Sequence, residues 1–395
     1  MKKIKQYFNQ VIKGKTALKL YRIVFQMIGL FPKKNNLVIF ESFHGKQFSD
    51  NPRAIYEYME KNYTEVNLIW SVDRRHTQLF ENLELPYIKR FTFKWFWYMP
   101  RAKYWVNNVR TPNWLPKPKN TILLQTWHGT PLKKLGADIE EVQIPGTNTE
   151  KYIKNVFSNA NQWDYLISPN RYSTTIFERA FDYTGHIIES GYPRNDILIN
   201  HSLNYADQIK KDLNIDLEKK VILYAPTWRD DEYYSVGNYK FDIKLNLKQL
   251  QDHFGDRYII LLRMHYLISD VLDLSGFEEF VIDVSSYTDI RDLYIISDVL
   301  ITDYSSVFFD YANLKRPIIF YAYDIEKYRE TLRGFYFNLE EAPGPITKTT
   351  EEVIHQIKKF EQSKVLGEKF ESFYQKFCYL EDGGSTQRVV SRFYE

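Results

Sequence analysis

The segment Val-Ile-Leu-Tyr-Ala-Pro-Thr-Trp-Arg-Asp-Asp, residues 221–231, joins an uncharged apolar run directly to a polar motif. A short apolar run of this kind fits a strand that is buried on both faces, as in a parallel sheet covered by helices. Helical periods, such as residues 52–61, separate some of the other runs. The alternation of strands and helices predicts an α/β protein. Further runs lie at residues 37–40, 68–70, 104–106, 122–124, 165–167, 258–262, 280–282, 299–301 and 317–320.

The chain is too long for one hydrophobic core. It has 395 residues, whereas single cores stop growing at roughly 250–300 residues. The alternation pauses at a charged helical link, residues 203–216, and then resumes. We therefore expect two Rossmann-like domains, residues 35–204 and 205–395, that face each other across a cleft. Residues 1–34 form a separate basic amphipathic segment, and residues 351–395 are predicted to be helical.

The composition is that of a folded globular protein. Hydrophobic residues make up 44% and charged residues 26% of the chain, which excludes a disordered protein, collagen-like repeats and a coiled coil. The single cysteine, Cys378, rules out an internal disulfide and indicates a reducing compartment. The uncharged stretch from Ile23 to Pro32 is about half of the ~20 residues that a membrane-spanning helix needs. A soluble or peripheral protein is expected.

The net charge of +3 hides an uneven distribution. No acidic residue precedes Glu41, and a second acid-free stretch, residues 85–137, contains ten Lys and Arg residues. Apolar residues recur at three- and four-residue steps on both sides of Gly14, which predicts an amphipathic helix with a basic face. Such a helix either lies on an anionic bilayer or packs on its own domain with the basic face in solvent.

Aromatic residues make up 17% of the chain. Residues 91–98, Phe-Thr-Phe-Lys-Trp-Phe-Trp-Tyr, combine rings with a cation inside the second acid-free stretch. Exposed rings beside cations stack on nucleic-acid bases or lie at the depth of lipid headgroups, whereas buried rings belong to a core strand or helix. Two basic aromatic segments in the first third of the chain favour a partner with a negatively charged surface.

Four of the predicted strands lead directly into polar motifs. Ligands of open parallel sheets bind beyond the carboxyl ends of the strands, so these motifs are the candidates for binding and catalysis. Of the eight histidines, only His128 and His265 stand in such motifs beside glycine or arginine, which makes them the acid/base candidates. The motifs are residues 125–131, 225–231, 263–265 and 302–306.

Hydroxyl and guanidinium groups at the strand ends suit a diphosphate ligand. Ser305 and Ser306 precede a predicted helix, whose first N–H groups favour an anion. Arg194, Arg229 and Arg263 offer donors that match phosphate oxygens. Taken singly, the serines are ordinary helix caps and the arginines ordinary ion-pair partners. Because the chain has no Walker loop, no G-x-G-x-x-G after a strand, no H-E-x-x-H, no G-x-S-x-G and no D-x-D, a metal-independent group transfer between two domains remains.

Five groups of residues agree in order and spacing with a known family. They are residues 127–133 (Trp-His-Gly-Thr-Pro-Leu-Lys), 226–229 (Pro-Thr-Trp-Arg), 263–265 (Arg-Met-His), 302–306 (Thr-Asp-Tyr-Ser-Ser) with Asp310, and 382–383 (Asp-Gly). From about Asn36 to the C-terminus, the chain resembles the CDP-glycerol glycerophosphotransferases of wall teichoic acid synthesis. The resemblance implies a GT-B-like fold and transfer of glycerol phosphate from CDP-glycerol, with release of CMP, to an undecaprenyl diphosphate disaccharide that bears glycerol phosphate.

The resemblance also implies roles for individual residues. His128 would be the base that takes the proton of the acceptor's glycerol hydroxyl, while Arg263 and His265 would hold the pyrophosphate and stabilise the transferred phosphoryl group. No cofactor is required, and a loosely bound Mg²⁺ ion on the donor diphosphate is compatible with the sequence. The donor site would comprise Trp127, His128, Gly129, Thr130, Pro131, Arg194, Thr227, Trp228, Arg229, Arg263, Met264, His265, Ser305, Ser306 and Asp310.

The expected location is the cytoplasmic face of the cell membrane, as a peripheral protein. Residues 1–34 and 87–119 would hold the N-terminal domain at the anionic surface where the lipid-linked acceptor lies. The absence of a long additional N-terminal region favours a priming or short-chain transferase. No nucleic-acid partner is expected, and a homo-oligomer stays open. Two alternatives remain: the same fold with CDP-ribitol or a nucleotide sugar as donor, and a non-catalytic protein that binds anionic lipid or nucleic acid.

Overall fold

The computed structural model describes residues 14–142, 147–227, 233–235, 238–239, 243–264, 273–326, 334–363 and 365–394. These residues group into two compact units. The first contains the described residues up to 128, residues 136–194 and residues from 386 onward, and the second contains residues 129–135 and 195–385. The predicted boundaries lie at residues 34/35 and 204/205. The structure instead includes the described residues before 35 in the first unit, begins the main segment of the second unit at Asn195, and assigns residues 129–135 to the second unit and the C-terminal residues to the first.

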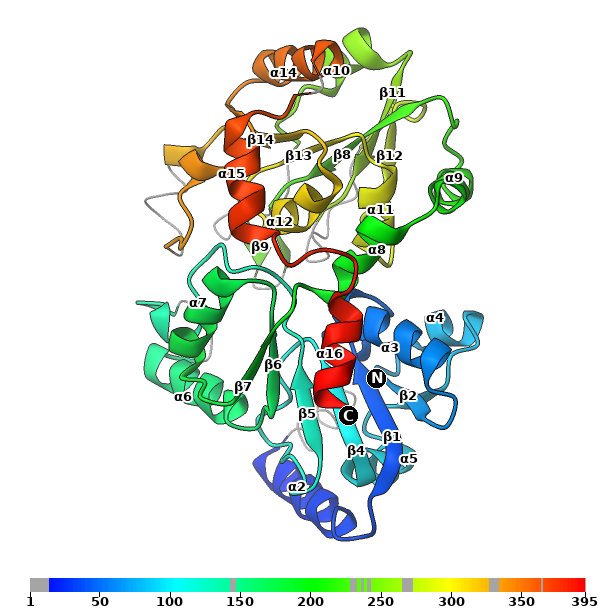
Figure 1. Cartoon of the computed structure of the whole chain (residues 1–395), viewed down its shortest axis with the longest axis vertical. Helices are drawn as coiled ribbons and strands as arrows, with labels where there is room; N and C mark the ends of the chain where they lie inside the picture. The colour runs from blue at the N-terminus through cyan, green and yellow to red at the C-terminus, as the bar shows by residue number, and fades with distance from the viewer. Residues whose placement is uncertain are drawn as a thin grey trace. The chain divides into compact units, whose positions relative to one another are not determined.

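The first unit contains a seven-stranded sheet in which all neighbouring strands are parallel. The strand order is β3-β2-β1-β4-β5-β6-β7 (Figure 1). The chain thus builds the sheet outward from β1 in one direction and then from β4 in the other, so the order reverses between these two strands. The strands are β1 (Lys34–Glu41), β2 (Asn67–Val72), β3 (Tyr87–Lys89), β4 (Ala102–Asn107), β5 (Ile122–Gln125), β6 (Tyr165–Ser168) and β7 (His186–Glu189).

Helices pack beside this sheet, and side-chain caps define where several of them begin. The side-chain oxygens of Asn148 and Asn170 accept hydrogen bonds from the N–H groups of Lys151 and Ser173 at the starts of α6 and α7. The helices of this unit are α2 (Lys15–Ile28), α3 (Asp50–Asn62), α4 (Thr77–Asn82), α5 (Phe93–Tyr98), α6 (Thr149–Ala160), α7 (Arg171–Phe181) and α16 (Ser385–Phe393), the last of which begins one residue before the chain enters this unit.

The second unit contains a six-stranded parallel sheet of the order β12-β11-β8-β13-β14-β15. Its strand order reverses between β8 and β13, just as the first sheet's order reverses between β1 and β4. The strands are β8 (Lys220–Ala225), β11 (Tyr258–Leu262), β12 (Val281–Asp283), β13 (Val299–Thr302), β14 (Ile318–Tyr321) and β15 (Ile346–Thr347). A small antiparallel pair, β9 (Tyr233–Ser235) with β10 (Asn238–Tyr239), lies outside this sheet.

The helices of the second unit cover a separate apolar core, built from strand residues such as Ile260 and Leu262 and from Val353 and Ile357 of α14. They are α8 (Asp196–Asn200), α9 (Leu203–Asp212), α10 (Leu247–Phe254), α11 (Ile290–Ile296), α12 (Val307–Tyr311), α14 (Thr350–Gln362) and α15 (Glu368–Phe377). The predicted α/β class with two parallel sheets is confirmed. Every predicted strand is present, and β3, β7 and β15 were not predicted because each of these short strands buries only one residue.

Part of the basic N-terminal segment, residues 1–13, lies outside the described residues. The helix that follows, α2, packs on the first unit through Phe25, which is fully buried. The Phe25 ring centroid lies 5.5 Å from that of Trp95 and 6.1 Å from that of Trp105. One face of this helix therefore belongs to the aromatic core of its own unit.

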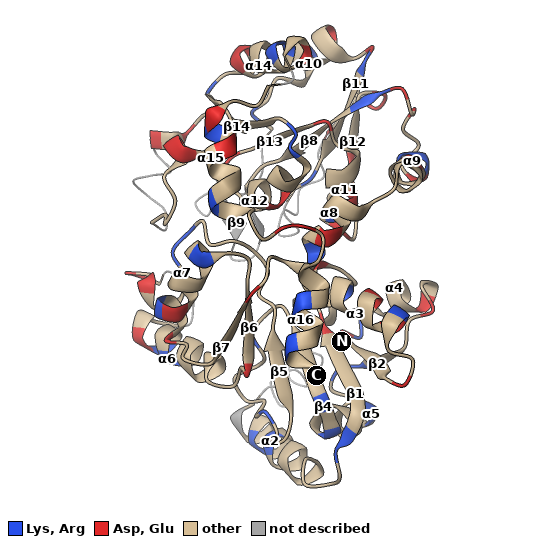
Figure 2. Ribbon diagram, in the orientation of Figure 1, with Lys and Arg blue, Asp and Glu red and all other residues tan. Residues whose placement is uncertain are grey.

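A second face of α2 remains exposed. Leu20, Ile23, Val24 and Met27 recur at helical spacing, and all four are exposed. Figure 2 shows basic segments and no acidic ones on α2 and α5. In α5, Trp95 is buried whereas Phe93 is 81% exposed. The aromatic stretch thus contributes both to the core and to a basic apolar surface.

Candidate active site

His128 lies three residues beyond β5, at the carboxyl edge of the first sheet. Its Nδ1 atom is 2.7 Å from the backbone carbonyl oxygen of Asn108, which follows β4. Because a carbonyl oxygen only accepts, Nδ1 must carry the proton and donate it. This hydrogen bond fixes the ring and leaves Nε2 as the basic nitrogen, which is the arrangement that a general base requires.

The surroundings of His128 favour its neutral form. Burial among protein atoms lowers the pKa of the ring below its ordinary value of 6.5, and the positive charges of Arg194 and Arg110 add to this effect. The hydrogen bond to Asn108 and the negative charge of Asp50 act in the opposite direction. The side chain keeps access to solvent, so a neutral imidazole at neutral pH remains open to a substrate hydroxyl.

The backbone just before His128 is strained and is held by a buried amide. Trp127 has φ of 54°, a left-handed conformation that a bulky residue rarely adopts. The Nδ2 group of Asn51 lies 3.3 Å from the carbonyl oxygens of both Thr126 and Trp127, and the Asn51 Oδ1 atom accepts the backbone N–H of Arg194 at 3.1 Å. Asn51 is fully buried. Its carboxamide therefore ties the peptide that positions His128 to α3.

Arg194 and Asp50 form a buried ion pair in the first unit. The Arg194 Nη1 atom is 3.1 Å from Asp50 Oδ1, and the two side chains are 7% and 9% exposed. The guanidinium group also lies 4.4 Å from the centre of the Tyr192 ring. Arg194 is therefore engaged with its own unit, and its predicted contact with the donor diphosphate stays a prediction.

The residues directly after His128 pack on the second unit. Lys134 donates its N–H to the Gly334 carbonyl oxygen at 2.8 Å, and Leu132 accepts the N–H of Tyr336 at 3.0 Å. A Cβ atom at Gly129 would lie 3.2 Å from Ser306 Oγ, which is tighter than an ordinary contact. Glycine at position 129 thus permits the close approach, and the structure brings the predicted segment Gly129 to Pro131 beside Ser306.

The reversal point of the second sheet unites two of the predicted motifs. Asp303, which follows β13, accepts the N–H of Thr227 at 2.8 Å and that of Tyr304 at 2.6 Å through one oxygen. Ser305 and Ser306 follow at the start of α12. The Ser306 hydroxyl makes no capping hydrogen bond to this helix, so its position before a helix is not explained by ordinary capping.

Arg263 and Met264, at the end of β11, are integrated into the second unit. The Arg263 guanidinium donates to the carbonyl oxygens of Val284, at 2.8 Å, and Tyr287. Burial lowers the pKa of Arg263 below its ordinary value. Met264 is buried in the apolar core of this unit. Their predicted donor contacts stay predictions.

Asp310 is also buried, and its Oδ1 atom accepts a hydrogen bond from Asn195 Nδ2 at 3.2 Å. The same amide nitrogen lies 3.0 Å from Glu381 Oε1, close to the predicted motif at residues 382–383. Three further predicted site residues, Trp228, Arg229 and His265, lie outside the described residues.

Residues 42–51 were not among the predicted site residues, yet three of them act on His128 or on the backbone just before it. Phe43 contacts the His128 ring with a centroid distance of 5.9 Å, and Asp50 and Asn51 make the contacts given above. The signal was present, because this segment directly follows the apolar run at residues 37–40. The rule that polar residues beyond strand ends form ligand sites would have selected it.

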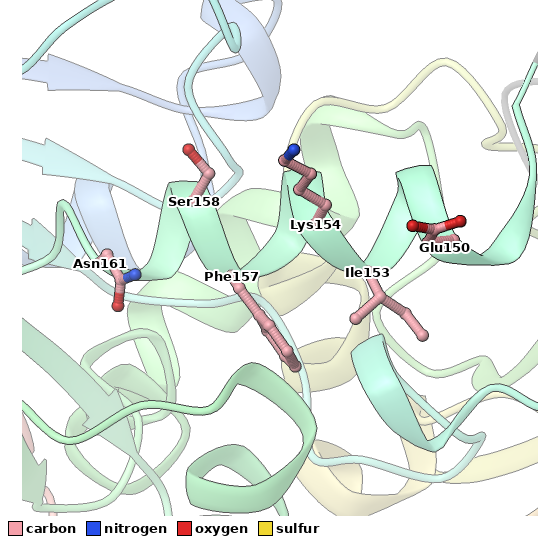
Figure 3. Close-up of a pocket in the computed structure, with 6 residues that line it drawn as sticks. All are labelled: Glu150, Ile153, Lys154, Phe157, Ser158 and Asn161. Carbon is pink, nitrogen blue, oxygen red and sulfur yellow. The ribbon is translucent and has the colours of Figure 1, made fainter.

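Three further features of the described residues concern a metal site, a membrane-spanning helix and a surface pocket. Among the residues that the structure describes, no group of three or more His, Cys, Asp or Glu side chains is arranged to hold a metal ion. Likewise, no helix in the described ranges has the length and hydropathy needed to cross a membrane. Figure 3 shows an open pocket along α6, lined by Glu150, Ile153, Lys154, Phe157, Ser158 and Asn161. None of these residues belongs to the predicted site.

In both units, polar motifs follow the carboxyl ends of parallel strands. In the second unit they lie where the strand order reverses, and in the first unit the His128 motif follows β5, the neighbour of β4. This arrangement defines a two-domain, GT-B-like α/β protein. The chain belongs to the CDP-Glycerol:Poly(glycerophosphate) glycerophosphotransferase family, whose sequence profile matches residues 23–395.

Three relatives illustrate this membership. The chain is 55% identical over 379 residues to the teichoic acid poly(glycerol phosphate) polymerase of Bacillus spizizenii, covering 94% of this chain and 95% of that protein. It is 49% identical to the teichoic acid glycerol-phosphate transferase of Staphylococcus aureus, covering 94% and 96%. With the polymerase of Bacillus subtilis it shares 55% identity over 96% of this chain, which spans only 51% of that protein.

Solved structures agree with the fold. The wall teichoic acid polymerase TagF, as a histidine variant soaked with CDPG, matches with a TM-score of 0.87 and 44% identity over 100% of this chain and 96% of that one. The UDP-GlcNAc 2-epimerase of Neisseria meningitidis matches with a TM-score of 0.50 and 13% identity, over 90% of this chain and 99% of that one. The second likeness concerns the fold alone.

Proposed function

We propose that this protein transfers glycerol phosphate from CDP-glycerol to the terminal glycerol hydroxyl of a lipid-linked acceptor in wall teichoic acid synthesis, with release of CMP. The observation that carries the proposal is the state of His128. Its Nδ1 atom donates to the Asn108 carbonyl oxygen, so the basic Nε2 atom is available. The residue lies at the carboxyl edge of the first sheet, in a chain that belongs to this family. Such a ring suits the removal of a hydroxyl proton.

In the proposed reaction, the acceptor's hydroxyl oxygen attacks the phosphorus atom that bears the donor's glycerol group. A new P–O bond forms, and the bond from this phosphorus to the oxygen that bridges the diphosphate breaks. CMP leaves with the electron pair, and Nε2 of His128 takes the hydroxyl proton. Arg263 and His265 are proposed to hold the diphosphate and to stabilise the charge of the transferred group.

The donor site is proposed to lie in the second unit. Its support is the cluster formed by the close approach of Gly129 to Ser306 and by the shared oxygen of Asp303, which links the loops after β8 and β13. Reversal points of this kind are where open α/β sheets bind nucleotides. The soak of TagF with CDPG concerns a relative with 44% identity and agrees with this choice of donor.

The test is CMP release by purified protein with CDP-glycerol and a defined lipid-linked acceptor. We expect CMP to form in step with incorporation of glycerol phosphate. Faster release of the nucleotide from CDP-ribitol or from a nucleotide sugar would show that this compound, rather than CDP-glycerol, is the donor. Failure to release the nucleotide from any donor, together with retained binding to anionic vesicles or nucleic acid, would favour the non-catalytic alternative.

The length of the product separates single addition from polymerisation. The relatives include both a glycerol-phosphate transferase and polymerases. With a large excess of CDP-glycerol, priming or short-chain transfer gives an acceptor extended by one or a few units. A ladder of long products would instead assign polymerisation.

We also propose that the transfer needs no metal bound by the protein. The proposed charge stabilisation comes from arginine and histidine side chains and from backbone N–H groups. Activity should then persist after dialysis against a chelator. Loss of activity that only added Mg²⁺ restores would instead assign a metal ion to the donor diphosphate.

Finally, we propose that the protein acts as a peripheral protein at the cytoplasmic face of the cell membrane. The support is the exposed face of α2, where Leu20, Ile23 and Met27 are 58%, 53% and 60% exposed. Lys19 and Arg22 on the same helix are also exposed and carry positive charge. An apolar ridge flanked by cations fits the interface of an anionic bilayer, where each cation contributes about 1 kcal/mol.

Replacing both Ile23 and Met27 with glutamate is expected to weaken binding to anionic vesicles by at least about 100-fold, because burial of each apolar side chain contributes ~1.5–3 kcal/mol. Sedimentation with vesicles that contain acidic phospholipid measures this effect. The matched control is Leu203→Glu in α9, which alters an apolar residue that is 83% exposed in the second unit. Equal vesicle binding by the double variant and the unaltered protein would contradict a membrane contact through α2.

A further inference from the structure

The reversal point of the first sheet carries a loop to which the proposed reaction gives no role. In an open parallel sheet, ligands bind beyond the strand ends where the strand order reverses, which in this unit is between β1 and β4. Residues 42–46, Ser-Phe-His-Gly-Lys, follow β1 there, and residues 108–110, Asn-Val-Arg, follow β4. His44 and Arg110 are therefore candidate ligand-binding residues.

The loop after β1 has an unusual conformation that its neighbours hold in place. Phe43, His44 and Gly45 are consecutive residues with φ values of 45°, 61° and 77°. Only glycine adopts such angles readily. The carbonyl oxygen of His44 accepts a hydrogen bond from Arg90 Nη1 at 2.6 Å, and Arg90 itself pairs with Glu41 at 3.1 Å in a buried position. Strained backbone that is fixed in this way concentrates at functional sites.

Asn108 connects this loop to His128. Its side-chain oxygen accepts the N–H of Phe43 at 2.9 Å, and its backbone oxygen accepts the Nδ1 proton of His128 at 2.7 Å. The Phe43 ring meets the His128 ring at an angle of 64°. One residue after β4 thus fixes both the proposed base and the loop, while the side chain of His44 remains exposed.

The charge around the two histidines is mainly positive. Partial burial lowers the pKa of His44, and Arg90, Lys46 and His128 lower it further, against the opposing effect of Glu41. Arg194 and Arg110 have the same sign of effect on His128. The two nearby carboxylates, Glu41 and Asp50, already pair with Arg90 and Arg194. An additional anion beside His44 would therefore be stabilised by the surrounding charge.

We propose that His44 and Arg110 bind the phosphodiester group of the acceptor's terminal glycerol phosphate unit and so place its terminal hydroxyl at His128. This inference rests on the proposed function. The acceptor's phosphodiester is separated from its terminal hydroxyl by the three carbons of glycerol, so the anion must lie close to the base that receives the proton. His44 is exposed, and Arg110, whose charge acts on His128 and whose guanidinium lies 5.3 Å from the centre of the Tyr152 ring, supplies further donors near the base.

The experiment compares two acceptors that differ in charge. One ends in glycerol joined through a phosphodiester, and the other ends in glycerol joined through a neutral linkage. His44→Gln and Arg110→Gln are each expected to raise the KM for the charged acceptor about tenfold, since hydrogen bonds to charged groups are strong. Neither should change the KM for CDP-glycerol or, at a pH well above the pKa of His128, the rate with the neutral acceptor, because Arg110 acts on the proposed base only through that pKa. His186→Gln, at the exposed amino end of β7, serves as the control.

A second substitution separates binding from folding. His44→Gly removes the imidazole but suits the left-handed backbone, so its melting temperature should equal or exceed that of the unaltered protein. The KM for the charged acceptor should still rise about tenfold, as for the glutamine variant. An unchanged KM, or an equal rise for the neutral acceptor, would overturn the proposal, and a rise in the KM for CDP-glycerol alone would assign the anion site to the donor. Failure of the proposed function would appear earlier, as absence of CMP release by the unaltered chain.

Discussion

Replacing His128 with alanine is expected to lower the rate of glycerol phosphate transfer by about 10²- to 10⁴-fold, the usual contribution of a general base. The ring's Nδ1 is committed to Asn108, so proton transfer falls to Nε2, and alanine has no group to replace it. Binding of CDP-glycerol should remain, because the proposed donor cluster lies in the second unit. CMP release and isothermal titration with CDP-glycerol measure the two properties.

The control for this variant is His186→Ala. His186 is exposed, begins β7 at the amino end of the strand, and stacks on Tyr165 with a centroid distance of 5.5 Å. It lies at the opposite end of the sheet from the proposed site, so the transfer rate should not change. Normal turnover by the His128 variant would exclude this residue as the base.

The dependence of the reaction on pH should follow from the lowered pKa of His128. Only the neutral ring can accept a proton, so kcat/KM should rise with pH through the pKa of His128 and then level off. Because burial lowers that pKa, the midpoint should lie below the ordinary value of 6.5. This acid limb should be absent from the residual activity of His128→Ala. A midpoint above 6.5 would mean that another group controls the rate.

Replacing Arg194 with methionine is expected to lower the free energy of unfolding by about 3–5 kcal/mol, because the buried Asp50 carboxylate would lose its partner. The two side chains are 7% and 9% exposed. Denaturant unfolding, followed by the fluorescence of tryptophans in the first unit, measures the loss. Combining the change with Asp50→Asn should recover part of it, since no unpaired charge would then remain buried.

A surface pair in the same unit provides the comparison. Arg179 is 58% exposed and pairs with Asp138 at 2.8 Å, so Arg179→Met should cost no more than about 1 kcal/mol. If Arg194→Met costs as little as this control but raises the KM for CDP-glycerol, Arg194 acts on the donor diphosphate, as the sequence predicts, rather than as an anchor of the first unit.

Much of the fold follows from short-range patterns. A central strand such as β11, Tyr258–Leu262, is buried at every residue, so its sequence is a continuous apolar run and can be recognised locally. The edge strand β3 is three residues long and buries only Ile88. Such a strand forms because the neighbouring strand β2 supplies backbone hydrogen bonds, and its sequence contains no apolar run from which it could be predicted.

The candidate site likewise contains residues that could be predicted from local sequence and residues that could not. His128 and the serines at 305 and 306 could be selected because they directly follow apolar runs, and strand ends are where ligands of parallel sheets bind. The loop at residues 42–46 also directly follows an apolar run and was not predicted, although Gly45 follows His44 just as Gly129 follows His128. The contacts of Asn51 with Thr126 and Trp127 join residues 75 and 76 positions apart. No local pattern encodes them.

The sequence by itself determined the α/β class, the parallel strands and the polar motifs at their ends, because each depends on the order of apolar and polar residues within a few positions. Only the tertiary structure decided which residues from distant parts of the chain contact one another. It paired Arg194 with Asp50, it let Asn108 hold both His128 and Phe43, and it returned α16 to the core of the first unit. These contacts arise when distant segments are buried together and must satisfy charge, hydrogen bonding and packing at the same time.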